Sequence, residues 1–224
     1  MESGSGEGFE SSAMDDYESL ISTTDVEILK RAWRNEKAAP EILQYEASLV
    51  QRSQEQIQLM EENIEESMGS GNDPLTVSLY QMDLDRTLFL LRSYLRTRLL
   101  KIEKYTSHIQ KTAEIWDRLS RQEQKFAKRC IDDIENHLDT SVLSKLPDRY
   151  KSSTKQSIIS EEDDMIPEPQ LDTFVVCRAK RYLGAFQLDD SGESEPFDMD
   201  TEDVCFLRYK AIKPLVYSGQ IDLV

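Results

Sequence analysis

Residues 74–111, PLTVSLYQMDLDRTLFLLRSYLRTRLLKIEKYTSHIQK, decide the fold of this chain. The stretch has no Gly and no Pro after its first residue, and it is rich in Leu, Arg, Met and Lys, which lose little side-chain freedom in a helix. We therefore predict a long central helix. Its aliphatic residues recur at steps of three, four or seven and fall on one stripe at about 100° per residue. These residues are Leu84, Leu88, Leu91, Leu95, Leu99, Ile102 and Ile109.

Other apolar residues of the central helix lie away from this stripe. Phe89 and Leu100 fall roughly opposite to it, and Leu90 and Tyr94 fall to its side. A surface helix with a single buried face would be polar at these positions. We therefore predict that one face packs on other helices of the chain and that a partner covers the second face.

Two arginines lie close to the same stripe. Arg98 falls about 40° from its centre, and Arg92 lies near its other edge. Because an unpaired buried charge costs several kcal/mol, each guanidinium needs a carboxylate or carbonyl partner. Two interpretations follow. Arg98 extends toward solvent and pairs with a glutamate of a neighbouring helix, or Arg96 or Arg98 pairs with an acid on another chain.

The charge of the chain is unevenly distributed. Its 224 residues carry a net charge of −16, which argues against attraction of the whole molecule to nucleic acid or anionic lipid. Residues 86–129 nevertheless contain twelve Lys and Arg against four Asp and Glu. The three cysteines are far apart and form no CxxC motif, which is typical of a reduced intracellular protein. We expect neither a membrane span nor a signal peptide.

Three further helices are predicted in the N-terminal two-thirds of the chain. The first begins at the capping box of residues 24–27 (TDVE) and ends near Lys37. Pro40 separates it from a second helix over residues 41–68. The last runs over residues 120–143 and begins with another capping-box sequence at Ser120.

The predicted chain has four parts. Residues 1–23 are an acidic, disordered tail. Residues 24–147 form a bundle of about four helices around the long central one. Residues 148–170, which hold several Ser, Pro and acidic residues, form a linker. Residues 171–224 form a small β-rich domain, so the fold class is mainly α with a β-rich C-terminus.

The β-rich domain is predicted from β-branched and aromatic runs between turn signals. It is small enough to bury little of its own surface, so we expect it to dock on another structure. Its strands are expected at residues 173–177, 182–188, 204–209 and 220–224, with a short strand near Phe197 and one helical turn in 212–217.

Two small features of the sequence bear on function. In the tail, Asp15 and Asp16 precede Tyr17, Leu20 and Ile21, which have one-turn spacing. The pattern indicates either a short helix that docks in the groove of a partner or an ordinary disordered tail. The sequence contains no GxGxxG, P-loop, GxSxG or HExxH motif. We therefore predict no enzyme activity, no cofactor and no metal site.

Several stretches together resemble one protein family. They occur in the same order from about residue 24 to the last residue, and they resemble the Sld-five family of subunits of the eukaryotic GINS complex. The matching stretches are residues 32–43 (AWRNEKAAPEIL), 58–63 (QLMEEN), 92–105 (RSYLRTRLLKIEKY), 171–176 (LDTFVV) and 207–221 (LRYKAIKPLVYSGQI).

The resemblance implies a nuclear, non-catalytic subunit of a heterotetramer with the three other GINS subunits. GINS joins the minichromosome maintenance ring and a third component in the replicative CMG helicase, which acts in the initiation and elongation of DNA replication. The ring holds the ATPase sites, so this subunit would have no catalytic chemistry, and its contact with DNA would be only indirect. The acidic tail, through residues 15–21, would contact a trimeric adaptor hub that links the helicase to polymerase alpha.

The resemblance and the helix pattern together give two sets of expected contact residues. The β-rich domain of the family helps to assemble the tetramer, which implies a role for Leu207, Tyr209, Pro214, Leu215 and Ile221. The expected subunit-interface residues of the central helix are Phe89, Arg92, Tyr94, Leu95, Arg96, Arg98, Leu100 and Tyr105.

An alternative function is a nucleic-acid-binding adaptor that acts through the basic region of residues 86–129. Two observations argue against it. The basic residues are distributed around helices that also carry core residues, and no aromatic platform for base stacking is interleaved with them.

Overall fold

The computed structural model describes residues 24–224 except 72, 156, 158, 160–164 and 187–196. The predicted tail motif of residues 15–21 lies outside the described residues. The described chain folds into two compact units. One contains residues 24–34 and Glu46–Tyr94, and the other contains Asn35–Tyr45 and the described part of Leu95–Val224.

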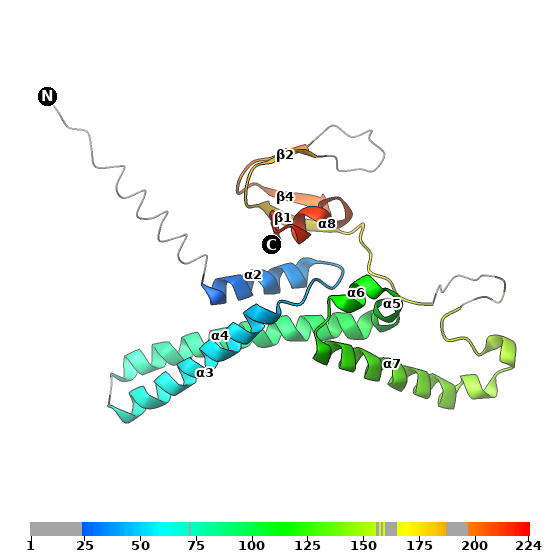
Figure 1. Cartoon of the computed structure of the whole chain (residues 1–224), viewed down its shortest axis with the longest axis horizontal. Coiled ribbons are helices and arrows are strands. Elements are labelled where there is room, and N and C mark those ends of the chain that lie inside the picture. The colour runs from blue at the N-terminus through cyan, green and yellow to red at the C-terminus, as the bar shows by residue number, and fades with distance from the viewer. Residues whose placement is uncertain (1–23, 72, 156, 158, 160–164, 187–196) are drawn as a thin grey trace. The chain divides into compact units, whose positions relative to one another are not determined.

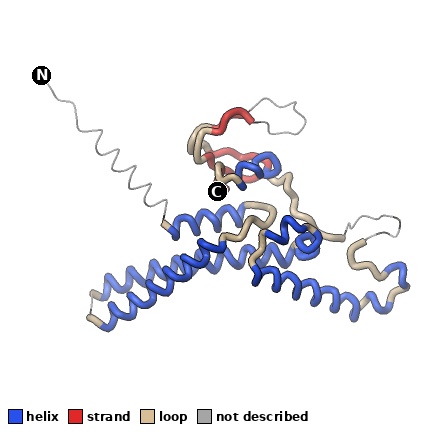
Figure 2. Tube along the Cα trace, viewed as in Figure 1, coloured by secondary structure: helices blue, strands red, loops and turns tan. Residues whose placement is uncertain are grey.

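Figures 1 and 2 show the secondary structure along the chain. The helices are α2 (Asp25–Ala38), α3 (Ala47–Gly69), α4 (Pro74–Lys104), α5 (Thr106–Lys111), α6 (Ala113–Asp117), α7 (Arg121–Ser141) and α8 (Tyr209–Tyr217), with 3-10 helices η1 (Leu143–Lys145) and η2 (Asp148–Tyr150). The strands are β1 (Phe174–Ala179), β2 (Leu183–Phe186), β3 (Phe197–Met199), β4 (Val204–Arg208) and β5 (Ile221–Leu223). A mainly helical region followed by a small β-rich domain is the fold class that the sequence predicts.

The first unit is built on a helical hairpin. In it α3 and the first part of α4 run alongside each other from a tight turn (Figure 1). Gly71 in that turn has φ +73°, a left-handed conformation that glycine adopts without steric cost. The apolar side chains buried in this unit come from all three of its helices. They are Leu29, Leu49, Val50, Ile57, Ile64, Val77, Leu84, Leu90, Leu91 and Tyr94.

The second unit has a helical core and a β-rich core. The helical core joins α4, α5, α6 and α7 through Ile42, Ile102, Ile109, Ile115, Leu119 and Ala127. Helix α7 begins with the predicted capping box. Ser120 Oγ accepts a hydrogen bond from Glu123 N at 3.2 Å, and Glu123 Oε2 accepts one from Ser120 N at 2.8 Å.

The central helix is shorter than predicted. The pattern favours one helix as far as residue 111, but α4 ends at Lys104 and a separate helix, α5, begins at Thr106. Tyr105 between them has φ −112° and ψ 21°, outside helical geometry. Thr106 Oγ1 donates hydrogen bonds to the carbonyls of Ile102 and Glu103. A threonine hydroxyl that bonds the preceding turn in this way bends or interrupts helices.

The second predicted helix, over residues 41–68, begins six residues late. Residues 39–46 form an extended loop, and α3 begins at Ala47. The loop is not helical because its backbone groups bond elsewhere. Tyr45 N donates to the Arg118 carbonyl at 3.0 Å, and Leu43 N donates to the Glu36 carboxylate at 3.3 Å.

The β-rich part of the second unit is an antiparallel sheet covered by a helix. Its three-stranded sheet has the order β4-β1-β5, with Cys177 of β1 opposite Cys205 of β4, and β2 pairs with β3 separately. Alternate residues of β1 point inward and pack with α8. The buried residues of this core are Ala39, Val175, Cys177, Ala179, Leu183, Met199, Leu207, Tyr209, Ile212, Val216, Ile221 and Leu223.

Candidate subunit interface

One side of α4 exposes a row of apolar side chains. Leu75, Met82 and Phe89 are spaced seven residues apart, and Leu100 follows eleven residues later; we call these four the exposed stripe. At about 100° per residue they lie within roughly 40° of one direction. Phe89 is 61% exposed and Leu100 is 59% exposed. Seven-residue spacing is the repeat by which one long helix packs along another.

The opposite side of α4 is buried in its own chain. Its buried apolar residues are Val77, Leu84, Leu91, Tyr94 and Ile102. Two positions depart from the predicted stripe, since Leu99 is 39% exposed and Leu90 is buried. The helix therefore carries apolar residues on two sides, one of which is covered within the chain.

Arginines accompany the exposed stripe. Arg92 and Arg96, two of the predicted interface residues, are exposed. Arg96 lies one helical turn before Leu100, on the same side of α4. The exposed surface of α4 from Phe89 to Leu100 is therefore apolar and cationic, which favours a partner that presents apolar and acidic side chains.

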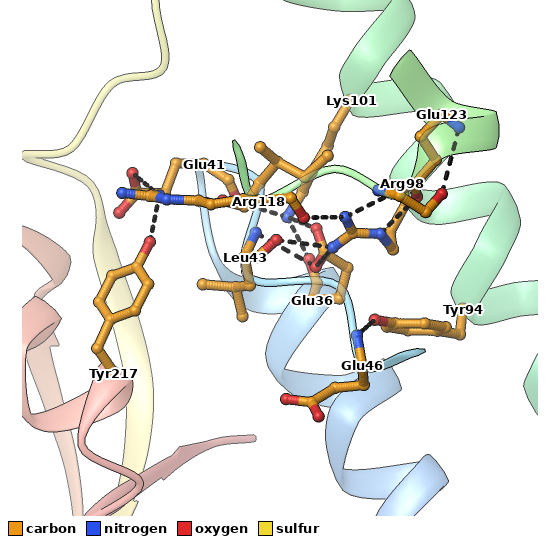
Figure 3. A network of polar contacts seen from close by, with 12 residues as sticks. Glu36, Glu41, Leu43, Glu46, Tyr94, Arg98, Lys101, Arg118, Glu123 and Tyr217 are labelled. Atoms are coloured by element: carbon orange, nitrogen blue, oxygen red, sulfur yellow. Dashed lines mark hydrogen bonds and ion pairs between the residues drawn. The ribbon is translucent and has the colours of Figure 1, made fainter. Parts of the chain in front are cut away.

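Arg98, in contrast, is completely buried within the chain. Its Nε and Nη2 donate to the two carboxylate oxygens of Glu123 at 2.7 and 3.2 Å, and its Nη1 donates to Glu36 Oε2 at 3.0 Å (Figure 3). Nη1 also donates to the Leu43 carbonyl at 2.8 Å, and Nη2 to the Arg118 carbonyl at 3.3 Å. The five N–H donors of the guanidinium thus have five acceptors. Desolvation of the charge is offset by these bonds.

This arrangement decides between the two interpretations of Arg98. The residue pairs with a glutamate of a neighbouring helix, Glu123 of α7, and with Glu36 of α2. It does not extend to solvent, and it is an interior residue of this chain. The prediction that Arg98 lies at the subunit surface is corrected accordingly.

Lys101 extends the same network toward the loop of residues 39–46. Its Nζ donates to Glu36 Oε1 at 2.8 Å, to the Glu41 carbonyl at 2.8 Å and to the Glu36 carbonyl. Burial lowers the pKa of Lys101, and the Glu36 carboxylate partly opposes that effect. The loop is therefore fixed to α4 by side chains rather than by a ladder of backbone hydrogen bonds.

Arg118 and Glu41 continue the network into the β-rich part of the second unit. Arg118 Nη1 donates to Glu41 Oε2 at 3.0 Å and also to the Tyr217 hydroxyl (Figure 3). Glu41 accepts a further bond from the Tyr209 hydroxyl at 3.1 Å and one from Lys213 Nζ at 3.0 Å. Because Tyr209, Lys213 and Tyr217 lie in α8, a single glutamate joins the loop, the helical core and the C-terminal helix.

The network holds equal numbers of opposite charges. Its inner members are buried and Glu114 lies at the surface, and the buried charges are tolerated because each has a counter-charge and hydrogen bonds. Its cations are Arg98, Lys101, Arg118 and Lys213, and its carboxylates are Glu36, Glu41, Glu114 and Glu123.

The carboxylate of Glu41 gives the network a measurable pH dependence. Burial raises its pKa, but the hydrogen bonds and charges of Lys213 and Arg118 lower it by more, so the pKa lies below the ordinary value of 4.5. A carboxylate with a lowered folded-state pKa stabilises the fold above its unfolded pKa and loses that contribution as the pH falls through the folded pKa.

We therefore expect Glu41→Gln to destabilise the chain at pH 7 and to matter less below about pH 4.5. The measurement is urea unfolding of the assembled complex at one fixed protein concentration, compared between pH 7 and pH 4. Glu135→Gln, a change at an exposed position of α7, is the control and should have little effect at either pH. A destabilisation by Glu41→Gln that is equally large at both pH values would contradict this assignment.

The remaining predicted interface residues of α4 lie at intermediate positions or inside. Leu95 and Tyr105 are half-buried. Tyr94 is buried, and its hydroxyl accepts a hydrogen bond from Glu46 N at 3.4 Å. Phe89 makes an edge contact with Trp33, with ring centroids 6.3 Å apart, yet remains mostly exposed.

The C-terminal residues expected in tetramer assembly divide in the same way. Leu207, Tyr209 and Ile221 belong to the core of their own domain. Pro214 is exposed and Leu215 is half-buried. The aromatic residues exposed on the outer face of the sheet are Phe174 and Phe206, whose ring centroids lie 5.1 Å apart in a stacked arrangement. The alternation of β1 predicts two faces but does not say which of them faces α8.

Arg98 is the one member of this network that the sequence pattern places close to the core. Glu36, Glu41, Arg118 and Glu123 were not singled out as buried. One signal was available for Glu123, because it is the last residue of the Ser120 capping box. No motif or periodicity in the sequence marks Glu36 or Glu41 as buried.

No group of three or more His, Cys, Asp or Glu side chains in the described part of the chain is arranged to hold a metal ion. No helix among the described residues is long and apolar enough to cross a membrane.

Comparison with known families identifies both parts of the chain. A family model for the "GINS complex protein helical bundle domain" matches residues 41–142. A second model, for the "DNA replication complex GINS protein SLD5 C-terminus", matches residues 169–224. Together they span more than half of the chain.

Curated relatives carry the same description over nearly their whole length. The DNA replication complex GINS protein SLD5 of Arabidopsis thaliana is 60% identical over 210 residues, which are 93% of this chain and 95% of the relative. The human protein of that name is 33% identical over 207 residues, 89% of this chain and 88% of the relative. The Schizosaccharomyces pombe protein is 30% identical over 203 residues, which are 89% of this chain and 92% of the relative.

Proposed function

The chain belongs to the SLD5 family of DNA replication complex GINS proteins, and on that basis we propose that it acts as a non-catalytic structural subunit of a GINS heterotetramer. The observation that carries the proposal is the exposed stripe of α4. Apolar side chains as exposed as Phe89 and Leu100, aligned along a helix of 31 residues, are costly in a solitary soluble chain. A partner helix laid along the stripe would remove them from water.

The division of roles within α4 supports this proposal. Its inner side, with Arg98, fixes the fold of the chain, and its outer side, with Arg92, Arg96 and the exposed stripe, is available for partners. The outer side offers apolar side chains and positive charge for assembly. The subunit would therefore act by positioning other proteins.

We further propose that the tetramer joins the minichromosome maintenance ring and a third component in the replicative CMG helicase in the nucleus. Membership of a DNA replication complex supports this proposal. From the sequence we also propose that the tail contacts a trimeric adaptor hub. The residues of this contact would be Asp15, Asp16, Tyr17, Leu20 and Ile21.

The nucleic-acid-binding alternative has less charge available than the sequence suggests. Within residues 86–129, Arg98 and Arg118 are buried, and Lys101 binds Glu36 and the loop of residues 39–46. Their charges are neutralised by carboxylates of the same chain. A salt-dependent shift of single-stranded DNA by the chain at physiological salt would favour the alternative.

Co-expression tests the proposed function. We expect the chain produced alone to aggregate and the chain produced with the three other GINS subunits to form a soluble complex with one copy of each. The physical reason is that the exposed stripe becomes buried only in the complex. Native mass spectrometry gives the stoichiometry. A stable, monodisperse monomer that does not bind the other subunits would contradict the proposal.

A further inference from the structure

The outer side of the first half of α7 carries a cluster of positive charge. Four exposed basic residues fall within roughly 100° of one another around the helix, and we call them the α7 basic cluster. They are Arg121, Lys125, Lys128 and Arg129. From its first to its last residue the cluster extends over about 12 Å of helix. None of its residues belongs to the exposed stripe of α4, so the cluster is a separate surface.

Within the described part of the chain, no carboxylate forms an ion pair with the α7 basic cluster. Glu123, which lies in the same two turns of α7, is buried and binds Arg98. Asp117, Asp132 and Asp133 flank the cluster in the sequence and are exposed, but none of them pairs with it in the described structure. The four cations are therefore available to the carboxylates of another molecule.

The cluster opposes the stability of its own helix. Lys125 is four residues from both Arg121 and Arg129, a spacing at which like charges repel across one helical turn. The N-terminal end of a helix carries partial positive charge and disfavours cations, and Arg121 is the first residue of α7. Residues that break a local rule without a compensating contact in the same chain are expected mainly at functional sites.

An aromatic residue borders the cluster. Trp116 of α6 is half-buried, and Lys128 Nζ lies 5.7 Å from the centre of its ring. Gln124 Nε2 donates a hydrogen bond to the Trp116 carbonyl at 3.2 Å, which fixes α6 to α7 at this point. Tryptophan and arginine are enriched among the residues that carry most of the binding energy of protein interfaces. The surface thus offers an apolar contact beside four cations.

The charge pattern along α7 favours a short acidic segment over nucleic acid. The exposed residues that follow the cluster on the helix include four acids, so the positive charge ends after little more than two turns. These acids are Asp132, Asp133, Glu135 and Asp139. A nucleic-acid strand running along α7 would bring its phosphates close to them. An extended segment of about four residues spans the cluster and would meet only its cations.

We propose that the α7 basic cluster and Trp116 dock an acidic segment of a protein outside the GINS tetramer. Carboxylates of that segment would pair with the cations of the cluster, and one apolar side chain would cover the exposed part of the Trp116 ring. Permanent subunit interfaces are large and mainly apolar, as the exposed stripe of α4 is. A small, charged surface suits a contact that forms and dissociates, and this difference places the partner outside the tetramer.

The test uses the assembled complex and a labelled peptide of about nine residues, Glu throughout except for a central Leu. Fluorescence anisotropy measures binding at low salt, because exposed ion pairs are screened as the salt concentration rises. Lys125→Glu combined with Lys128→Glu should weaken binding about tenfold or more. Lys151→Glu combined with Lys155→Glu makes the same change of charge at exposed positions outside α7 and should change binding by less than about twofold. Replacing the central Leu by Ser should weaken binding severalfold.

Each other outcome overturns the proposal. Equal binding to the two doubly substituted complexes would mean that the peptide binds elsewhere or by net charge alone. Absence of binding to the wild-type complex would mean that the cluster is no docking site for acidic segments. Tighter binding of a single-stranded DNA of about nine nucleotides than of the peptide, lost with Lys125→Glu and Lys128→Glu, would assign the cluster to nucleic acid. If that variant fails to assemble, a fellow subunit covers the cluster; this result removes the outside partner and leaves the proposed function intact.

Discussion

Replacing Arg98 by Met should destabilise the chain by about 3–5 kcal/mol, the usual cost of breaking a buried ion pair by removing one partner. The side chains are similar in length, but Met leaves the Glu36 and Glu123 carboxylates buried without their shared cation and the Leu43 carbonyl without its donor. For a chain of this size we expect the melting temperature of the purified complex to fall by roughly 6–20 °C.

Further variants separate loss of the network from loss of a positive charge. Arg129→Met, at an exposed position of α7, should leave the melting temperature almost unchanged. Arg98→Lys keeps the charge but has three donors instead of five. Its melting temperature should therefore lie between those of the Arg98→Met and Arg129→Met complexes. Adding Glu36→Gln and Glu123→Gln to Arg98→Met should recover part of the loss, because no carboxylate is then left unpaired. If Arg98→Met melts like the wild type, the network does not hold the fold.

The second large effect is expected from Leu100→Asp on the exposed side of α4. Leu100 is 59% exposed, so the change should leave the fold of the chain intact. In the proposed complex the aspartate would be buried without a partner, and assembly should weaken by on the order of 100-fold. Co-purification of the other GINS subunits with the tagged chain measures the effect.

Leu59→Asp is the matched control for this variant. Leu59 of α3 is 57% exposed and lies outside the exposed stripe. The same substitution there should leave co-purification near the wild-type level. Equal loss of assembly in both variants, or no loss in either, would show that the exposed stripe has no special part in assembly.

The main helices could be predicted because their signals are local. The period of the apolar residues places α4, and the Ser120 capping box places the start of α7 to the residue. The two apolar sides of α4 were also visible, since Phe89 and Leu100 point away from Leu84 and Leu91. These features depend on residues within one or two helical turns of each other.

What the sequence did not reveal depends on distant contacts. The loop of residues 39–46 reads as the start of a helix, yet Arg98, Lys101 and Arg118 bond its carbonyls and hold it extended. These donors lie 55 to 76 residues further along the chain. The same long-range pairing explains why Arg98 lies in the interior instead of at the predicted interface. No periodicity in the sequence records such a pairing.

The C-terminal residues illustrate a related limit. Alternation along β1 separates two faces, but either face could have been the inner one. Tyr209 and Ile221 proved to be interior, with the Tyr209 hydroxyl bonded to Glu41. Burial and the Glu41 charge raise the pKa of Tyr209, so this phenol stays a neutral donor.

Hydroxyl-radical footprinting of the assembled complex tests most directly whether the outer side of α4 is covered by fellow subunits. Phe89 and Leu100 are the reporting residues, and Leu59, which is similarly exposed in the chain, is the internal reference. We predict that oxidation of Phe89 and Leu100 falls severalfold relative to Leu59 when the complex forms. Unchanged oxidation of both residues in an intact four-subunit complex would contradict the claim that this surface is the one that assembles.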